Sequence, residues 1–287
     1  MTSIATVLFN GVAYGMLLFI MSVGLSVTLG MMNFVNLAQA SFSMFGGYIV
    51  VLVVQRLGLP FLVSLPIAFI IVGLFSIVIE RLVFRHFYGT DDLTQVLLTI
   101  GLVFMSISTA SYFFGGTYQR IDMPAWLSGQ RDIFGLTLER YRIFIVVSGA
   151  ILSLVLILGL ERTKLGGMVR ACVDNPRAAN GCGLNTQMIF AVTFAIGGGL
   201  AGLGGALSAN LLGIDPNFPL RYLVYLLIIV SVGGMGTIGG TLIAAVTLGV
   251  ADVAGKYYFP SFGGFVIYAI TIAVMLWRPR GLLGRTA

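Results

Sequence analysis

Five uncharged polar side chains stand close together inside a run of apolar residues near the N-terminus. An unpaired polar group in lipid is costly, so these side chains should face the protein interior or a water-filled path. Two functions fit this pattern: the side chains bond neighbouring helices to one another, or they line the path of a solute. The residues themselves leave both interpretations open. They are Asn33, Asn36, Gln39, Ser41 and Ser43.

A second polar stretch, Glu161–Asn185, lies between two apolar stretches in the second half of the chain. Its Asn175-Pro176 pair is typical of a helix start, because Asn caps free N–H groups and Pro fits the first helical position. Gly181 or Gly183 can end this helix, so we predict about two helical turns projecting from the membrane. Such a helix can dock in a groove of a partner protein, and the alternative is an ordinary solvated loop.

Enzymatic chemistry has little support in the residues. His86 is the single histidine, and Cys172 and Cys182 show no metal-ligand spacing. No set of nucleophile, acid and base types converges in the pattern. We therefore predict no catalytic residues, no metal site and no enzymatic activity.

Two glycine-rich stretches match nucleotide-binding motifs by letters alone. Gly197–Gly202 follows no strand and lies inside an apolar run, so Gly198, Gly202 and Gly205 instead favour close helix packing. In Gly249–Lys256 the glycines are one residue too far apart for a phosphate loop. We predict no ATP site and no bound cofactor on this chain.

The composition defines the scaffold that must position these groups. Of 287 residues, 58% are hydrophobic and only 9% are charged, with a mean hydropathy of +1.03. An average soluble domain carries about 25% charged residues, so much of this surface must face lipid. The net charge of +6 is explained by basic residues beside apolar spans, not by nucleic-acid binding. The predicted fold class is an all-α, polytopic helical membrane protein.

About eight spans are predicted, because a membrane-crossing helix needs about 20 apolar residues. A broken or re-entrant helix pair is expected near Gly233–Gly240. The apolar stretches are Ile4–Gly30, Ala38–Val54, Phe61–Ile79, Leu93–Phe114, Ile143–Leu160, Met188–Leu212, Tyr222–Ala251 and Tyr257–Trp277.

Basic residues predict the orientation of these spans. Arg162–Arg177 and the tail Arg278–Arg285 are rich in arginine and should both be cytoplasmic. An even number of crossings must then separate them, which requires Tyr222–Ala251 to fold as a hairpin of two short helices. The N-terminus falls outside by the same count. Because glycine-interrupted short spans point to a transport path, Gly234 and Gly236 become candidate pathway residues.

Several short motifs follow one another along nearly the whole chain. They are Gly24–Gly30, Asn33–Ala38, Met44–Tyr48, Glu80-Arg81, Gly167–Ala171, Gly183–Asn185, Gly233–Gly240 and Arg278–Arg285. In this order and spacing the chain resembles the permease subunits of branched-chain amino-acid ABC importers, specifically the shorter of the two permease types.

The resemblance implies a single transmembrane domain over 1–287, with a coupling-helix loop at 161–187. It implies a second related permease as partner in a heterodimer, two cytoplasmic ATPase subunits that use the ATP, and a periplasmic solute-binding protein. The location is then the bacterial inner membrane, where the chain makes several passes. The ATPase-coupling residues would be Arg170, Asp174, Asn175, Pro176, Arg177, Asn180 and Gly183. The substrate pathway would include Asn33, Asn36, Gln39, Ser41, Ser43, Gly234 and Gly236.

One departure from the family pattern bears on the solute. Amino-acid members usually read Ala-His-Gly-Glu where this chain has Ala38-Gln39-Ala40-Ser41. An ionisable pair has thus become neutral, so the solute need not be leucine, isoleucine or valine. The expected solutes are branched-chain amino acids or a related small solute, such as an amide, another amino acid or an aromatic carboxylate.

The main alternative is a stand-alone secondary transporter or channel. Ion coupling needs a buried ionisable residue in mid-span, whereas charges here lie at span ends, which counts against proton coupling but not against a passive channel. The span-end charges of the second half are Asp215, Arg221, Asp252 and Lys256.

Overall fold

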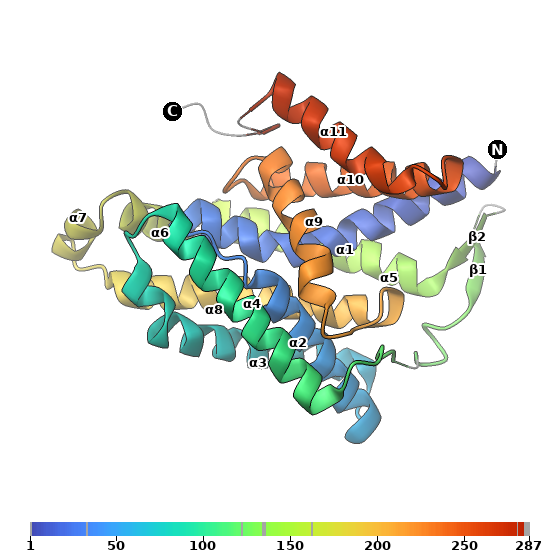
Figure 1. Cartoon of the computed structure of the whole chain (residues 1–287), viewed down its shortest axis with the longest axis horizontal. Coiled ribbons are helices and arrows are strands. Elements are labelled where there is room, and N and C mark those ends of the chain that lie inside the picture. The colour runs from blue at the N-terminus through green and yellow to red at the C-terminus, as the bar shows by residue number, and fades with distance from the viewer. Residues whose placement is uncertain are drawn as a thin grey trace.

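A computed structural model describes residues 2–32, 34–121, 123–133, 136–161, 163–279 and 281–283. The chain is almost entirely helical. The α-helices are α1 (Thr2–Met32), α2 (Gln39–Val51), α3 (Phe61–Leu82), α4 (Asp92–Phe114), α5 (Arg140–Leu156), α6 (Lys164–Asp174), α7 (Pro176–Gly181), α8 (Thr186–Leu211), α9 (Phe218–Gly233), α10 (Ile238–Tyr258) and α11 (Gly263–Trp277). Helices α1, α8 and α10 run along the long axis of the molecule, and α2, α4 and α9 cross it at an angle (Figure 1).

Short elements of other types extend or join these helices. A 3₁₀ turn, Phe84–Phe87, follows α3, and strands β1 (Gln130–Ile133) and β2 (Leu136–Glu139) pair antiparallel. Short π-helical segments extend α2 over Leu52–Arg56 and α5 over Ile157–Glu161.

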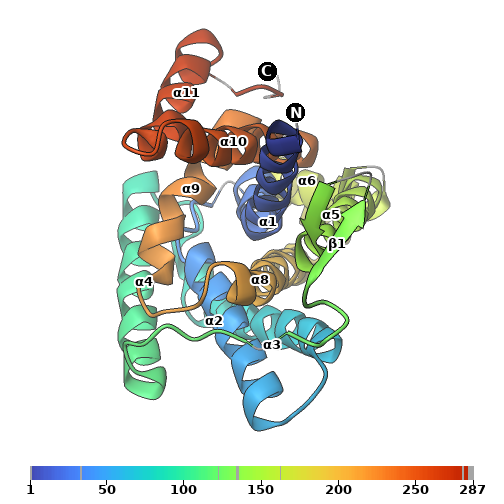
Figure 2. The ribbon, with the colours of Figure 1, turned by 90° about the vertical axis from the view of Figure 1, so that its right-hand side faces the viewer.

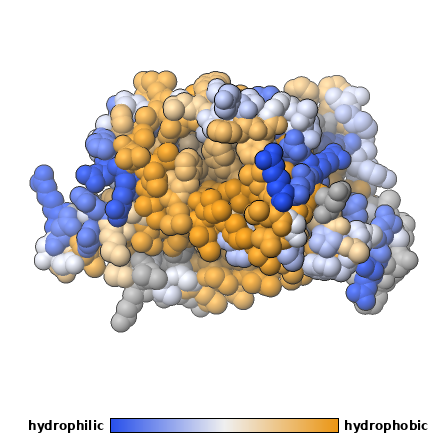
Figure 3. Space-filling model, turned by 90° about the horizontal axis from the view of Figure 1, so that it is seen from below, coloured by the Kyte–Doolittle hydropathy of each residue, from blue (hydrophilic) through white to orange (hydrophobic). Residues whose placement is uncertain are grey.

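The lengths and surfaces of the helices fit a membrane. Six helices are long and apolar enough to cross a bilayer, and α9 and α11 are shorter apolar helices. Large apolar side chains such as Ile70, Leu74 and Phe104 are exposed on their outer faces. Figure 3 shows the resulting apolar band between two hydrophilic ends. The prediction of an all-α polytopic membrane protein is confirmed.

Helix α1 lies at the centre of the bundle, with other helices around it in the end-on view of Figure 2. It packs against α10, α8, α5 and α9. The run Leu17–Met21 is fully buried, because α1 has no charged residue over its length and turns no polar face to solvent. Burying apolar residues on all sides is the pattern expected of a core helix.

Close backbone contacts join α2 to α8. A Cβ added at Gly205 would lie 1.6 Å from the Ser43 carbonyl oxygen, and one at Gly46 would lie 2.0 Å from the Gly202 carbonyl oxygen. Gly198 and Gly202 face Ser76 and Val72 of α3 in the same way. The predicted small-residue packing face is therefore confirmed, and it is what lets α2 and α3 approach α8.

The predicted interruption near Gly233–Gly240 is also confirmed. The apolar stretch Tyr222–Ala251 is divided between α9 and α10 by a turn over residues 234–237, where Gly234 and Gly236 adopt positive φ angles of 97° and 83°. Such angles suit glycine, because a Cβ would clash with the backbone. Helices α8, α9, α10 and α11 then lie between Arg177 and Arg278. This number is even, as the predicted cytoplasmic location of both basic segments requires.

Other boundaries differ from the prediction. Helix α10 continues through Tyr257 and Tyr258, and α11 begins only at Gly263. The predicted start of the last span at Tyr257 was wrong, because apolar residues continue across the real turn at Phe259–Phe262. Sequence analysis also placed no strands between Gly115 and Tyr141, where β1 pairs with β2 from Gln130 opposite Glu139 to Ile133 opposite Leu136.

Two sets of elements mark opposite ends of the long axis. Helix α7 projects at one end, and the β1–β2 hairpin and the N-terminal end of α1 lie at the other (Figure 1). We call these two ends of the molecule the α7 end and the hairpin end. The α7 end is the one predicted to be cytoplasmic.

Candidate functional site

A polar break separates α1 from α2 within the helix bundle. Helix α1 ends at Met32, residues 34–38 are not helical, and α2 begins at Gln39 without a side-chain cap on its N-terminus. Asn33 lies outside the described residues. Phe34 is buried among the rings of Phe84, Tyr88 and Phe194. These aromatic contacts hold the non-helical segment inside the protein, as backbone at membrane depth requires.

Gln39 joins three helices at this break. Its Nε2 donates a hydrogen bond of 2.7 Å to the Gly197 carbonyl of α8, and its Oε1 accepts one of 3.5 Å from Asn36 Nδ2. A Cβ at Gly24 of α1 would lie 2.1 Å from the Gln39 Nε2. The side chain therefore fills a slot that exists only because Gly24 has no side chain. These contacts support the helix-bonding role for Gln39.

Asn36 and Ser41 have hydrogen-bonding capacity left over. The Asn36 Oδ1 and the Ser41 Oγ are buried and have no protein partner, whereas the Ser43 Oγ donates to the Gln39 carbonyl at 3.5 Å. A buried unpaired polar atom costs about 1–3 kcal/mol. The unpaired Asn36 Oδ1 and Ser41 Oγ are therefore better candidates for binding a solute than the side chains of Gln39 and Ser43, which are already bonded.

Tyr48 extends this set along α2, and sequence analysis did not select it. Ser41, Met44 and Tyr48 share one face, since residues three and four apart align on a helix. The Tyr48 ring stacks on Phe114 at 4.1 Å, and its buried hydroxyl has no partner. Its spacing could have indicated it, because Tyr48 lies seven positions after Ser41 and so falls on the same face of the helix.

Asp215 carries a further unpaired atom just before α9. Its Oδ2 pairs with Arg221 at 2.9 Å, while its Oδ1 is buried without a partner. The Arg221 guanidinium also contacts the Tyr118 hydroxyl. Towards the end of α10, Asp252 is buried and pairs with Lys256 at 2.6 Å. These charges lie close to helix ends, as predicted, but both carboxylates are buried instead of lying in the interface.

The turn that contains Gly234 and Gly236 has a different character. Met235 and Gly236 are exposed, and the polar side chain of the turn, Thr237, donates to the carbonyl oxygens of Gly233 and Gly234. The C-terminal segment covers part of the turn, since the Leu282 N–H donates to the Val232 carbonyl at 2.8 Å. Gly234 and Gly236 thus serve as turn residues, and their role in the solute path stays a prediction.

The polar stretch after α5 folds into two helices, of which one was predicted. The Asn175 side chain caps α7 by accepting from the Ala178 N–H at 3.0 Å, and Pro176 is the first helical residue. The chain leaves α7 through Gly183, whose φ is 83°, with the Leu184 N–H bonded to the Ala179 carbonyl. This is a Schellman ending. The predicted short capped helix is confirmed.

Helix α6 was missed, because the stretch was interpreted as a polar loop. Val169 and Cys172 are buried three residues apart, and this spacing was the available signal. Burial also raises the pKa of the Cys172 thiol, whereas Cys182 is exposed. Both cysteines are free.

The predicted coupling residues divide between these helices and their ends. Arg170 and Asp174 belong to α6, and Arg177 is exposed on α7. The Asn180 Oδ1 accepts hydrogen bonds from the Thr186 hydroxyl at 3.3 Å and the Thr186 N–H at 3.5 Å. Helix α7 is therefore tied to the first residue of α8, so a displacement of α7 acts directly on a membrane-spanning helix.

The long apolar helices, with apolar side chains on their outer faces, define a polytopic helical membrane protein. The family profile described as "Branched-chain amino acid transport system / permease component" matches residues 7–275. The chain belongs to this family. It is a transmembrane permease subunit of an ABC importer, as the sequence motifs predicted.

Individual relatives agree with the family assignment. The chain is 26% identical to the high-affinity branched-chain amino acid transport system permease protein BraD of Pseudomonas aeruginosa, over 97% of this chain and 95% of BraD. It is 26% identical to LivH of Escherichia coli, over 97% of this chain and 94% of LivH, and 26% identical to LivM of the same organism, over 94% and 68%. No solved structure matches the chain.

Proposed function

We propose that the chain forms one half of the solute pathway of an importer in the bacterial inner membrane. The solute would be a branched-chain amino acid or a related small solute, such as another amino acid, an amide or an aromatic carboxylate. The observation that carries this proposal is the family match over residues 7–275. The unpaired buried atoms of Asn36 and Ser41 add support, since they offer hydrogen bonds to a small polar solute.

The second half of the pathway would be a related but different permease. The chain is similar to both LivH and LivM of Escherichia coli, which are named as permease proteins of a high-affinity branched-chain amino acid transport system. Two such permeases in one organism support a heterodimer. A periplasmic binding protein would deliver the solute at the hairpin end.

Energy would come from two ATPase subunits docked at the α7 end. Helix α7 exposes Arg177, and its ends are fixed by the Asn175 cap and the Gly183 turn. A short helix with fixed ends can transmit a push without unwinding, and the Asn180–Thr186 bonds pass it to α8. The permease chain would bind no ATP or other cofactor itself and would catalyse no reaction.

The direct test is mild-detergent purification of the tagged chain from its native membrane, followed by mass spectrometry and reconstitution in liposomes. We expect a second permease and ATPases to co-purify, and radiolabelled leucine uptake to require ATP and a binding protein. Uptake by the chain alone without ATP would overturn the importer in favour of a channel or a secondary transporter.

A substitution on α7 tests whether this helix docks on the ATPase subunits. Arg177→Glu reverses an exposed charge on α7 and should abolish solute-stimulated ATPase activity while leaving folding unchanged, because exposed substitutions change stability by less than about 0.5 kcal/mol. Arg177→Lys is the matched control, since it keeps the positive charge at the same exposed position of α7. Equal ATPase stimulation in both variants would contradict docking on α7.

A further inference from the structure

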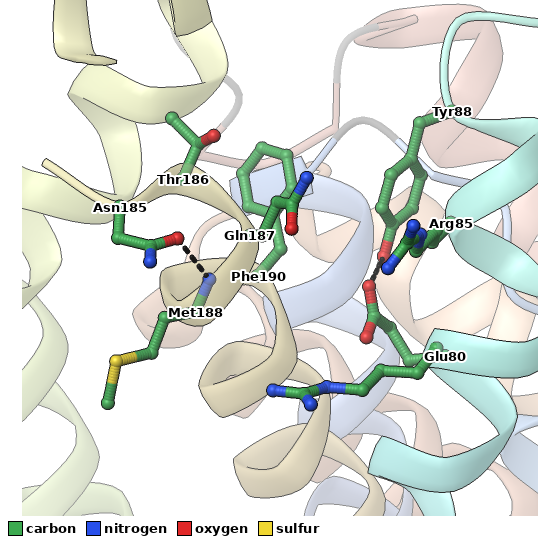
Figure 4. A pocket seen from close by; sticks show the side chains of 9 residues that line it. Glu80, Arg85, Tyr88, Asn185, Thr186, Gln187, Met188 and Phe190 are labelled. Carbon is green, nitrogen blue, oxygen red and sulfur yellow. Dashed lines mark hydrogen bonds between the residues drawn. The ribbon is translucent and has the colours of Figure 1, made fainter.

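A cavity of about 450 Å³ opens at the α7 end, between the end of α3 and the start of α8. The 3₁₀ turn Phe84–Phe87 and Tyr88 complete its α3 side. Figure 4 shows Arg85 and Tyr88 on that side, with Asn185 and Gln187 of the α8 side across the opening. The cavity adjoins the polar break, because the Tyr88 ring packs on Phe34, but none of the break residues 34–38 lines it.

The α3 side of the cavity carries an excess of positive charge. Arg81 and Arg85 line it and are exposed, whereas the one carboxylate, Glu80, is buried. The Tyr88 hydroxyl donates to the Glu80 Oε1 at 2.8 Å, as Figure 4 shows. Burial and the neighbouring carboxylate raise the pKa of Tyr88, so its hydroxyl keeps its proton and stays bonded to Glu80. Glu80 is thus bonded to Tyr88; its charge also acts on Arg81 and Arg85, but among the described residues neither guanidinium forms an ion pair with it.

The α8 side adds the positive end of a long helix. Helix α8 has 26 residues, and its first turn lines the cavity. The N-terminus of a helix carries a partial positive charge that favours anions. Asn185 and Thr186 are themselves fixed, because the Asn185 side chain caps the Met188 N–H and Thr186 is bonded to Asn180. Both sides of the cavity therefore favour a negatively charged group.

The surface beside the cavity is apolar and faces outward. Val78 and Leu82 of α3 are 50% and 69% exposed, and Met188 of α8, which lines the cavity, is 61% exposed. An occupant that satisfies both regions has an anionic head and apolar tails.

We propose that this cavity binds the phosphate headgroup of an anionic phospholipid, with Arg81 and Arg85 on the phosphate and the acyl chains along α3 and α8. Basic pockets between membrane helices are known to hold such headgroups. The site has a structural link to α7, because Thr186 in its wall is bonded to Asn180. A lipid bound here would stiffen the junction between α7 and α8.

Native mass spectrometry of the full chain, titrated with phosphatidylglycerol or phosphatidylcholine, tests the proposal. We expect tighter binding of phosphatidylglycerol, and a loss of about fivefold in that affinity for each arginine removed in Arg81→Gln and Arg85→Gln. Arg131→Gln and Arg140→Gln, exposed at the hairpin end, are the matched controls and should bind as the wild type does. Equal affinities for the two lipids, or unchanged binding in the cavity variants, would overturn the site.

Two further experiments identify the bound ligand. Arg81→Lys and Arg85→Lys keep the charge and should keep most of the binding, which guards against variants that merely misfold. Inorganic phosphate should compete only weakly, because it lacks acyl chains for the exposed face of α3 and α8. Competition by phosphate at the concentration of the lipid, or absence of the lipid from the intact importer purified with its partners, would overturn the lipid assignment. The readout is lipid binding, so it is independent of whether the transport proposal holds.

Discussion

The α1–α2 break and helix α7 are both short polar segments between apolar helices, yet different interactions hold them. At the break, Gln39 reaches Gly197, 158 positions away in the chain, and the contact depends on Gly24 of a third helix. In α7 the fixing bonds are local, from Asn175 to Ala178 and from Leu184 to Ala179. The first segment is held by contacts from distant parts of the chain, whereas the ends of the second are fixed by bonds between neighbouring residues.

This difference separates two kinds of function. A segment that only the bundle holds is sensitive to how the surrounding helices move, which suits a solute path that must open and close. A segment with its own caps keeps its shape while it moves, which suits the transmission of force. Substitutions in the two segments, and at Gly205 of α8, which packs on α2, test this contrast. Their expected effects on the unfolding free energy decrease in the order Gly205, Gln39, Asn175 and Ser41.

Gly205→Ala should be the most damaging change near the break. The added Cβ would meet the Ser43 carbonyl oxygen at 1.6 Å, so α2 and α8 would have to separate. We expect a loss of about 3 kcal/mol in unfolding free energy, the upper range for overpacking, measured by denaturant titration in detergent. Gly101→Ala is the control, since Gly101 of α4 has open space around it and alanine favours helix. Equal stability of the two variants would show that α2 and α8 are not fixed against one another.

Gln39→Leu should be the next most damaging. It leaves the Gly197 carbonyl and the Asn36 Nδ2 without their buried partner, which costs about 2 kcal/mol. Gln55→Leu is a close match, because Gln55 donates to the Arg120 carbonyl at the same 2.7 Å but in an exposed position. We expect the Gln55 variant to unfold within about 0.5 kcal/mol of wild type. If the Gln39 variant loses uptake at wild-type stability while the Gln55 variant transports normally, Gln39 lines the path instead of bonding helices.

The same contrast explains what the sequence predicts and what it does not. The Asn175-Pro176 start and the Gly183 end of α7 were predictable, because caps depend on residues a few positions apart. The α9–α10 turn was predictable for the same reason, since its glycines mark it locally. Long apolar spans such as α3 and α4 follow from composition alone.

The site itself was only partly predictable. The polar residues of the break could be selected, but not which atoms remain unpaired, because Gln39 and Ser41 differ only in what the folded bundle brings to them. Tyr48 escaped notice because its environment is set by Phe114, which lies on a different helix. Helix α6 was not predicted, because its charged residues made the stretch resemble a polar loop and the spacing of the buried Val169 and Cys172 was overlooked.

Asn175→Ala should have a smaller and strictly local effect. Removing the cap should lower the stability of α7 by about 1 kcal/mol and leave the other helices unchanged. Hydrogen exchange of the α7 amides should become about fivefold faster, while exchange in α8 stays unchanged. Asn175→Asp preserves an N-cap acceptor and should exchange as wild type does. If the alanine variant also loosens α1 or α2, α7 is not an independent unit and the contrast between the two segments fails.

Ser41→Ala should have the smallest effect on stability and a clear effect on transport. The Ser41 hydroxyl is buried without a partner, so its removal should leave the unfolding free energy within about 0.5 kcal/mol of wild type or raise it. If the hydroxyl binds solute, its loss should raise the KM for uptake about tenfold, which corresponds to about 1.4 kcal/mol.

Ser43→Ala separates this role from general damage to the break. Ser43 lies two residues further along α2, and its hydroxyl is bonded to the Gln39 carbonyl at 3.5 Å. We expect its KM to stay at the wild-type value. A Ser41 variant with an unchanged KM would remove Ser41 from the solute path and leave Asn36 as the candidate with a free buried atom at the break, because Tyr48 lies two turns further along α2.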